Sequence, residues 1–313
     1  MAHQRLAHSE AEVATARAAQ ATGSCLVAST LSSCTLEDIA AASGPARWFQ
    51  LYLQPQREHS LDLLHRAENA GYRAIVLTLD ASIQLASRSA LQAGFAMPPD
   101  CVPANLARYP QPAPAQPAAG ESRIFQGAMR HAPRWDDLRW LLASTRLPVW
   151  IKGVLHPDDA RELQAAGAAG LIVSNHGGPP LARAPPPPPV LRPPPPPPGG
   201  RPPPPPPTRG GPSRAGRPHS LRMLPALRAA VGAGYPLLLD GGVRSGQDAF
   251  KALALGADAV LVGRLQVYAL AVAGALGVAH MLQMLAEELH ACMAQAGCAQ
   301  LSDITHDTLT PSC

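Results

Sequence analysis

Short apolar runs alternate with amphipathic stretches along most of this chain. A buried parallel strand reads as a short, nearly continuous apolar run, whereas a surface helix repeats its apolar residues every three to four positions. Runs of the first kind occupy residues 25–30, 48–52, 74–80, 148–154, 170–178, 236–242 and 259–264. Helical spacing occupies residues 9–22, 35–42, 56–70, 135–144, 157–166, 221–231, 246–255 and 273–296. Ser9 and Glu12 have the spacing of a capping box and predict the start of the first helix.

The alternation of strands and helices predicts βαβ units in a parallel sheet. Each predicted strand ends in polar or glycine-rich residues, which is typical of a (β/α)8 TIM barrel, where the carboxyl ends of the strands hold the active site. The pattern supplies seven strands, so we predict that the chain lacks most of the first barrel strand. A doubly wound open sheet is the alternative, which the absence of a GxGxxG turn disfavours. We expect one barrel domain over residues 1–313.

Four polar side chains lie where predicted strands end, and each has a chemical and a structural interpretation. His176, in SNHGG, is a candidate general base, or else a histidine that only closes a loop. Asp80 is a candidate partner that orients and stabilises an imidazolium, or a helix N-cap. Lys152, one of only two lysines, stands in the apolar run PVWIKGV, where an ammonium needs an anion unless it snorkels to solvent. Tyr52 is a candidate donor to a substrate, or an aromatic that lines the barrel.

Two glycine-rich loops follow the last two predicted strands. They are DGGVRSG at residues 240–246 and GR at residues 263–264. Glycines let backbone N–H groups approach a phosphate, and Arg244 and Arg264 supply positive charge. Because barrels often bind phosphate with the loops after their last two strands, we favour a phosphate site over ordinary turns with solvated arginines.

Composition and charge narrow the class of protein. The net charge of +4 has a local source, because residues 179–218 contain six arginines and no acid, so the chain shows no nucleic-acid signature. The six cysteines form no CxxC pair, which predicts neither a metal site nor a disulfide framework and favours a reducing, cytoplasmic compartment. No apolar run of membrane-spanning length is free of charges and glycines, so we predict no membrane span.

A proline-rich tract interrupts the pattern at residues 179–218. It holds 21 of the 36 prolines, and 17 of these stand in three uninterrupted runs. Proline runs favour extended polyproline II structure and cannot pack a core. We therefore predict a disordered insertion within the barrel domain, with a role as a peptide ligand as the alternative.

The segments that carry the candidate residues together resemble the FMN-dependent α-hydroxy-acid dehydrogenase/oxidase family, which includes glycolate oxidase, lactate oxidase and mandelate dehydrogenase. The segments are WFQLY, AIVLTLD, LPVWIKGVL, GLIVSNHGG, LLLDGGVRSGQDAFKALALGADAVLVGR and the last helix. The resemblance covers most of residues 2–178 and 219–305. It implies an FMN-binding barrel that oxidises a small L-2-hydroxy acid, such as lactate, glycolate or mandelate, to the 2-oxo acid. It also implies O2 or another electron acceptor and makes a homotetramer possible.

The resemblance also implies roles for individual residues. His176 is similar to the base that takes a proton while the α-hydrogen leaves as hydride to the flavin, and Asp80 is similar to its partner. Lys152 resembles the lysine that stabilises anionic flavin, and Tyr52 resembles the tyrosine that, like the histidine, contacts the substrate. Positions that match flavin contacts are Ala2, Ser32, Gln50, Thr78, Lys152 and Ser174. Positions that match the phosphate-side loops are Asp240, Gly241, Gly242, Arg244, Gly263 and Arg264.

Two positions depart from the family pattern, in addition to the first strand. Pro179 stands where the family has the arginine that grips the substrate carboxylate, and Ser87 stands where it has a second arginine. Three hypotheses stay open: an active flavin-dependent oxidoreductase, a catalytically impaired relative that at most binds FMN, and a different phosphate-binding barrel such as an isomerase. The occurrence of Lys152 and His176 on successive strands favours the two flavin hypotheses over the third.

Overall fold

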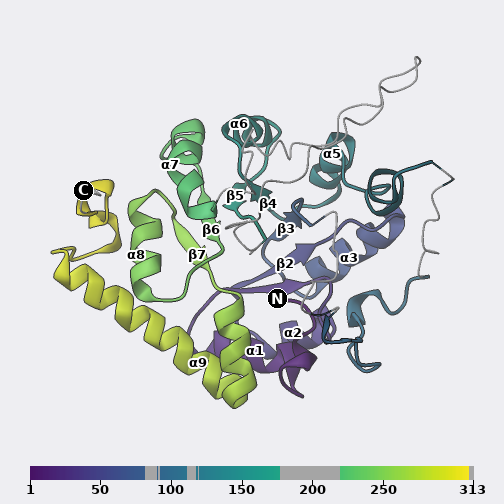
Figure 1. Cartoon of the computed structure of the whole chain (residues 1–313), viewed down its shortest axis with the longest axis horizontal. Helices are drawn as coiled ribbons and strands as arrows, with labels where there is room; N and C mark the ends of the chain where they lie inside the picture. The colour runs from purple at the N-terminus through teal and green to yellow at the C-terminus, as the bar shows by residue number, and fades with distance from the viewer. Residues whose placement is uncertain (82–89, 91, 111–117, 119, 177–218, 310–313) are drawn as a thin grey trace.

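Seven parallel strands form one curved sheet in the computed structural model, which describes residues 1–81, 90, 92–110, 118, 120–176 and 219–309 (Figure 1). The strands are β1 (Leu26–Ser29), β2 (Arg47–Leu51), β3 (Ile75–Thr78), β4 (Val149–Val154), β5 (Gly170–Val173), β6 (Leu237–Asp240) and β7 (Ala259–Leu261). Each strand pairs in parallel with the next one in the chain, so the spatial order follows the sequence order. A doubly wound sheet would reverse its order part-way, so that alternative is wrong. The sheet forms a half-barrel.

Helices cover the outer face of this sheet and follow the strands in turn (Figure 1). They are α1 (Ala11–Ala21), α2 (Leu36–Ala42), α3 (Arg57–Asn69), α5 (Trp135–Ser144), α6 (Pro157–Ala165), α7 (Ser220–Val231), α8 (Gly246–Ala254) and α9 (Arg264–Gln295). Short 3-10 or π turns add η1 (Gln4–Leu6), η2 (Ala104–Leu106), η3 (Arg123–Ala128), η4 (Leu301–Asp303) and η5 (His306–Thr308). Local capping starts two of the helices, because the Thr35 and Ser245 hydroxyls accept hydrogen bonds from the N–H groups three residues ahead. The predicted element order is therefore confirmed.

One predicted helix start was wrong, and one helical segment was missed. The N-cap of α1 is Glu10 and makes no side-chain cap, because the Glu12 carboxylate bonds to two distant loops, so Ser9 and Glu12 form no capping box. α9 consists of two helices separated by non-helical backbone at Ala273 and Gly274, so the helix predicted over about residues 273–296 is its second part, and the part that begins at Arg264 was missed. Gly274 has a φ of +55°, and a Cβ there would lie 2.9 Å from the His8 imidazole, so close packing requires glycine at this break.

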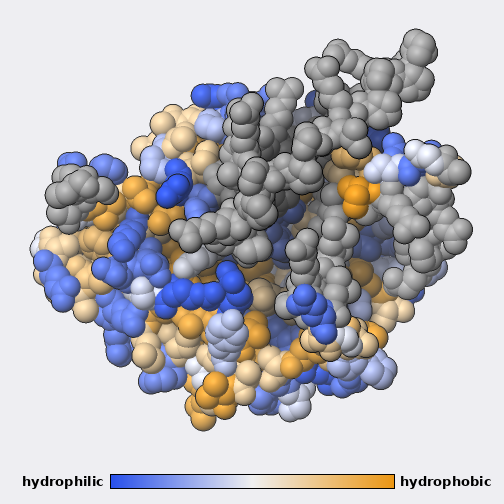
Figure 2. Space-filling view, in the orientation of Figure 1, coloured by the Kyte–Doolittle hydropathy of each residue, from blue (hydrophilic) through white to orange (hydrophobic). Residues whose placement is uncertain are grey.

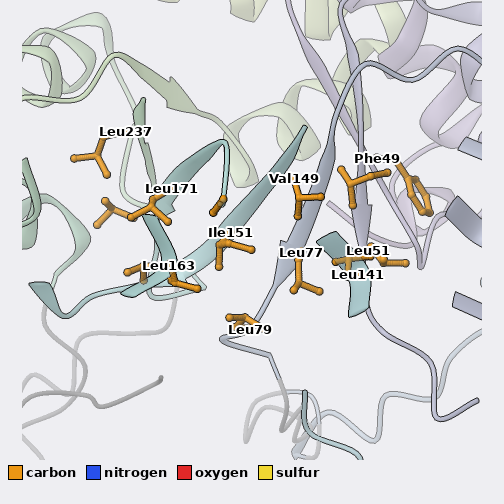
Figure 3. Close-up of a cluster of buried hydrophobic side chains, with 14 of the residues drawn as sticks. Phe49, Leu51, Leu77, Leu79, Leu141, Val149, Ile151, Leu163, Leu171 and Leu237 are labelled. Carbon is orange, nitrogen blue, oxygen red and sulfur yellow. The ribbon is translucent and has the colours of Figure 1, made fainter. Parts of the chain in front are cut away.

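The main core lies between the sheet and its helices. Strand residues such as Phe49, Leu77 and Ile151 point outward onto Leu141 of α5 and Leu163 of α6, and all five are fully buried (Figure 3). Aliphatic side chains predominate in this layer, as expected for a chain with 4% aromatic residues. This core holds the strands in register, and so it fixes the positions of the strand ends that carry the candidate site.

A second apolar cluster fills the inner face of the sheet. Val76, Ile172 and Leu238 are buried there, and Trp48 packs on Trp150 with ring centroids 4.8 Å apart. Gly170 opens β5 directly beside the second of these rings. A Cβ added to Gly170 would lie 2.3 Å from the Trp150 ring, so the indole occupies the space that a larger residue would need.

We expect Gly170→Ala to lower the free energy of unfolding by about 1–3 kcal/mol, because the added methyl must displace a packed indole. Gly234→Ala is the matched control, since a Cβ there meets no atom within 4 Å; we expect it to change stability by less than about 0.5 kcal/mol. Urea unfolding followed by tryptophan fluorescence measures both. Equal midpoints for the two variants would contradict this account of the inner cluster.

One helix of the described chain, α9, is long and apolar enough to cross a membrane by length and composition, with 22% of that segment buried. Tyr268, Val272 and Leu276 are exposed along it, and Figure 2 shows hydrophobic side chains at the lower edge of the view, where α9 lies. The backbone break at residues 273–274 divides this segment. The expectation of no membrane span is thus not confirmed and stays a prediction.

Several predictions fall outside the described residues. The proline-rich tract from Pro179 to residue 218 and the substitution of the second arginine by Ser87 lie there. The predicted single domain over residues 1–313 and the lack of most of a first strand also stay predictions.

Candidate active site

Side chains from four neighbouring strands meet at the carboxyl edge of the sheet. Asp80 follows β3, and His176 follows β5 with a φ of +60°. This left-handed backbone turns the chain back, and the His176 N–H donates a hydrogen bond to Ser174 Oγ at 2.9 Å. His176 Nδ1 lies 2.9 Å from Asp80 Oδ1. The predicted histidine–aspartate pair is therefore formed, although the two residues are 96 positions apart in sequence.

The second group at this edge is centred on Lys152 in β4. Lys152 Nζ donates to Ser174 Oγ at 2.8 Å and lies 2.9 Å from Asp240 Oδ2 at the end of β6. Ser174 Oγ donates in turn to Asp240 Oδ2 at 2.7 Å. Lys152 also lies 3.8 Å from Asp80 Oδ2, which connects this group with the histidine pair. The lysine is thus held by anions, and the snorkelling alternative is wrong.

The charges of this cluster determine the state of Asp80, whose side chain is 2% exposed. Burial alone would raise the pKa of Asp80, but the hydrogen bond with His176 and the nearby charge of Lys152 outweigh it, so the pKa lies below its usual value. The carboxylate is consequently ionised at neutral pH. The ionised carboxylate lies 2.9 Å from His176 Nδ1 and so orients the imidazole ring.

A glycine that sequence reasoning missed allows Asp80 to lie in this place. Gly153, directly after Lys152, has a φ of +104°, and a Cβ there would lie 2.6 Å from the Cβ of Asp80. A larger residue would push the carboxylate away from both His176 and Lys152. The glycine within the strand run WIKGV was the available signal, because an isolated strand glycine often marks the close approach of another chain segment.

A strip of buried polar side chains crosses β1, β2 and β3 beside this cluster. Gln50 Nε2 donates to Thr78 Oγ1 at 3.1 Å, and Gln50 Oε1 accepts from Ser29 Oγ at 3.1 Å. Ser32 Oγ donates to the Ser29 carbonyl at 2.7 Å. The predicted flavin contacts Ser32, Gln50 and Thr78 therefore lie in one network, together with Ser29, which sequence reasoning missed.

The glycine loops lie after β6 and β7. Gly241 and Gly242 have φ values of +109° and +86°, and a Cβ at Gly242 would meet no atom within 4 Å. Their backbone N–H groups donate to no other residue of the described chain. Arg244 and Arg264 are exposed, and Gly263 is the N-cap of α9. Free N–H groups beside open space and two guanidinium groups suit a phosphate.

Two other predicted residues, Tyr52 and Ala2, lie at the same edge of the sheet. Tyr52 follows β2, is half-buried, and its N–H donates to Thr30 Oγ1 at 3.1 Å. Ala2 lies at the start of the chain, next to His3, whose N–H bonds to the Leu31 carbonyl at 3.1 Å. The hydrogen bond between His3 and Leu31 places Ala2 at the carboxyl end of β1, in the same layer as the other candidate residues.

Comparison with known proteins identifies the family of this chain. The profile of the family described as FMN-dependent dehydrogenase matches residues 1–311. The chain is 83% identical over 313 residues to an L-lactate oxidase of Alicycliphilus denitrificans, covering 100% of this chain and 77% of that protein. It is 40% identical over 300 residues to a 4-hydroxymandelate oxidase of Amycolatopsis orientalis, covering 95% of this chain and 74% of that protein.

Solved structures of mandelate oxidase are also similar to this chain. Mandelate oxidase with (S)-2-phenylpropionate superposes with a TM-score of 0.75 at 38% identity, covering 97% of this chain and 74% of that one. A mandelate oxidase variant with the C4a-OH-FMN adduct superposes with a TM-score of 0.74 at 37% identity, covering 96% of this chain and 75% of that one. The chain therefore belongs to the FMN-dependent dehydrogenase family, and it is an FMN-dependent oxidoreductase.

The residues present fit FMN. The open, positive-φ glycine pair Gly241–Gly242 and the two arginines suit its phosphate, as described above. The amide of Gln50 and the hydroxyl of Thr78 suit the heteroatoms at the polar edge of its ring system. Lys152 in β4 would supply a cation for negative charge on the ring system of bound FMN.

Proposed function

We propose that this chain oxidises an L-2-hydroxy acid to the 2-oxo acid, with L-lactate as the substrate to test first and O2 as the final electron acceptor. The observation that carries the proposal is the joined cluster of His176, Asp80 and Lys152 at the ends of three adjacent strands. The relatives named L-lactate oxidase and 4-hydroxymandelate oxidase support the substrate class. A homotetramer and a cytoplasmic location remain predictions.

His176 performs the proton transfer in this proposal. Its Nδ1 is held by Asp80, which leaves Nε2 to take the proton of the substrate hydroxyl as the α-hydrogen departs. Asp80 stabilises the resulting imidazolium without taking the proton itself. FMN, when bound, supplies the acceptor for the hydride, and O2 or another acceptor then removes the two electrons.

The remaining side chains hold the reactants. Lys152 places a positive charge beside His176 and Asp80, and it is fixed by Ser174 and Asp240. Tyr52 is the proposed donor to the substrate. Ala2, Ser32, Gln50, Thr78 and Ser174 are the proposed contacts to the ring and ribityl side of the cofactor, and Asp240, Gly241, Gly242, Arg244, Gly263 and Arg264 are those on the phosphate side.

A catalytically impaired protein that only binds FMN is the second candidate. The observation that favours it is Pro179, because proline carries no charge and donates no hydrogen bond where the family pattern has a carboxylate-binding arginine.

A visible absorption spectrum of the protein reconstituted with FMN separates the two candidates. We expect bound flavin whose visible absorbance bleaches when L-lactate is added without oxygen. Flavin that stays unbleached by lactate, glycolate and mandelate would establish the impaired protein instead. FMN mixed with lactate in the absence of the protein is the control for direct reaction, and failure to retain FMN would contradict both candidates.

A further inference from the structure

A buried polar cluster lies between η1, α1 and α9, and it includes neither His176 nor Lys152. It consists of Gln4, Glu12, Thr15 and Gln266, which are between 3% and 7% exposed, and we call it the seam cluster. Gln4 belongs to η1, Glu12 and Thr15 to one face of α1, and Gln266 to the first turn of α9. These four polar side chains are thus buried together, although none of them takes part in the proposed chemistry.

Hydrogen bonds join these four residues to each other. Thr15 Oγ1 donates to Gln4 Oε1 at 2.6 Å. Gln266 Nε2 donates to Thr15 Oγ1 at 2.8 Å and to Gln4 Oε1 at 3.1 Å. The beginning of α9 is therefore tied to η1 and α1, although Gln266 and Gln4 are 262 positions apart in sequence.

Glu12 extends the cluster to the loop after β1. Its Oε1 accepts the Gln4 N–H at 3.0 Å, and its Oε2 accepts the Ser33 N–H at 3.0 Å. Hydrogen bonds to a buried carboxylate are among the stronger ones in proteins. The two oxygens of one side chain thus fix the distance between the first residues of the chain and the loop that contains Ser32.

In the described chain, no ladder of backbone hydrogen bonds joins β1 to β7. β1 pairs with β2 and β7 pairs with β6, so the two outer strands of the sheet are not joined to each other. The loops that follow these two outer strands carry Ser32 on one side and Gly263 and Arg264 on the other. The seam cluster spans the interval between them, above the apolar packing of Ala14 and Ala18 against Leu270.

We propose that Glu12 is a positioning residue for FMN, which acts through the seam cluster by holding three loops in one arrangement. These loops carry Ala2, Ser32 and the pair Gly263–Arg264. The inference rests on the proposed FMN contacts of those residues. Glu12 itself need not touch the cofactor, because its carboxylate is already occupied by the Gln4 and Ser33 N–H groups.

Titration of the apoprotein with FMN, followed by flavin fluorescence, tests the proposal. Glu12→Gln keeps the side-chain volume but turns an NH2 group toward one of the two N–H donors, so that one loop is released. We expect the dissociation constant for FMN to rise about tenfold or more. Thr15→Val, which removes the hydroxyl that links Gln4 to Gln266, should raise it in the same direction.

Glu68 and Thr145 provide matched controls at the amino end of β4. Glu68 Oε1 accepts the Thr145 hydroxyl at 2.6 Å and the Arg146 N–H at 3.3 Å, so it resembles Glu12 in chemistry but lies at the opposite edge of the sheet from the loops. We expect Glu68→Gln and Thr145→Val to leave the dissociation constant within about twofold of wild type. Circular dichroism confirms that each titrated variant is folded.

The outcomes separate this proposal from the proposed function. Unchanged FMN binding in folded Glu12→Gln and Thr15→Val, or equal weakening in the Glu68→Gln and Thr145→Val controls, would overturn the positioning role alone. A wild-type chain that takes up no FMN would overturn the assignment of the loops and the proposed function with it. Selective weakening in the two seam variants supports the proposal, since a general loss of stability would affect both pairs of variants.

Discussion

His176→Asn is expected to reduce kcat/KM for L-lactate by about two to four orders of magnitude while FMN stays bound, because the variant removes a general base. Asparagine is chosen because it tolerates the left-handed backbone that His176 adopts, whereas alanine would add strain there. The side chain is 42% exposed, so its replacement costs little packing. Stopped-flow measurement of flavin bleaching under anaerobic conditions gives the rate directly.

His156→Asn is the matched control for this variant. His156 follows β4, and its Nδ1 accepts the Asp158 N–H at 3.2 Å and lies 3.7 Å from the Asp158 carboxylate. It is therefore another histidine beside an aspartate, and asparagine serves equally well as a helix cap in its place. We expect His156→Asn to bleach at the wild-type rate. Bleaching of His176→Asn at that rate would contradict the assignment of the base.

The sequence was sufficient to predict the strands and the central site residues. Each buried parallel strand appears as a compact apolar run, and strands in sequential order bring their carboxyl ends to one edge. Asp80 and His176 follow β3 and β5, and Lys152 lies in the second half of β4, so the predicted strands brought all three side chains to one edge of the sheet. His176 and Asp80 are 96 positions apart in sequence, and the parallel order of the strands brings their side chains within 2.9 Å of each other.

The capping box that was predicted wrongly and the helix break that was not predicted both depend on contacts that no local pattern contains. Glu12 has capping-box spacing, but its carboxylate binds Gln4 and Ser33 because the fold brings their N–H groups to it. The break in α9 falls in an alanine- and glycine-rich stretch without proline, and it arises where His8 packs against Gly274. Tertiary partners outweigh local preference at both places.

Lys152→Met is expected to lower the free energy of unfolding by about 3–5 kcal/mol, because it removes the cation from a buried cluster and leaves two carboxylates without it. The Lys152 side chain is 13% exposed, and those of Asp80 and Asp240 are 2% and 19% exposed. Methionine keeps the apolar stem of lysine, so lost packing contributes little. Lys251→Met is the matched control, since Lys251 is the only other lysine and lies in the last turn of α8.

The effect of Lys152→Met should depend on pH with a definite sign. Because the folded state lowers the pKa of Asp80, its ionised form contributes stability above the unfolded value of about 3.9, and this contribution is lost as the pH falls through the folded value. The difference between wild type and Lys152→Met is therefore largest near neutral pH and narrows in acid. Urea unfolding at a series of pH values measures it. A difference that is equally large below about pH 3 would show that packing, rather than the charge of Lys152, stabilises this edge of the sheet.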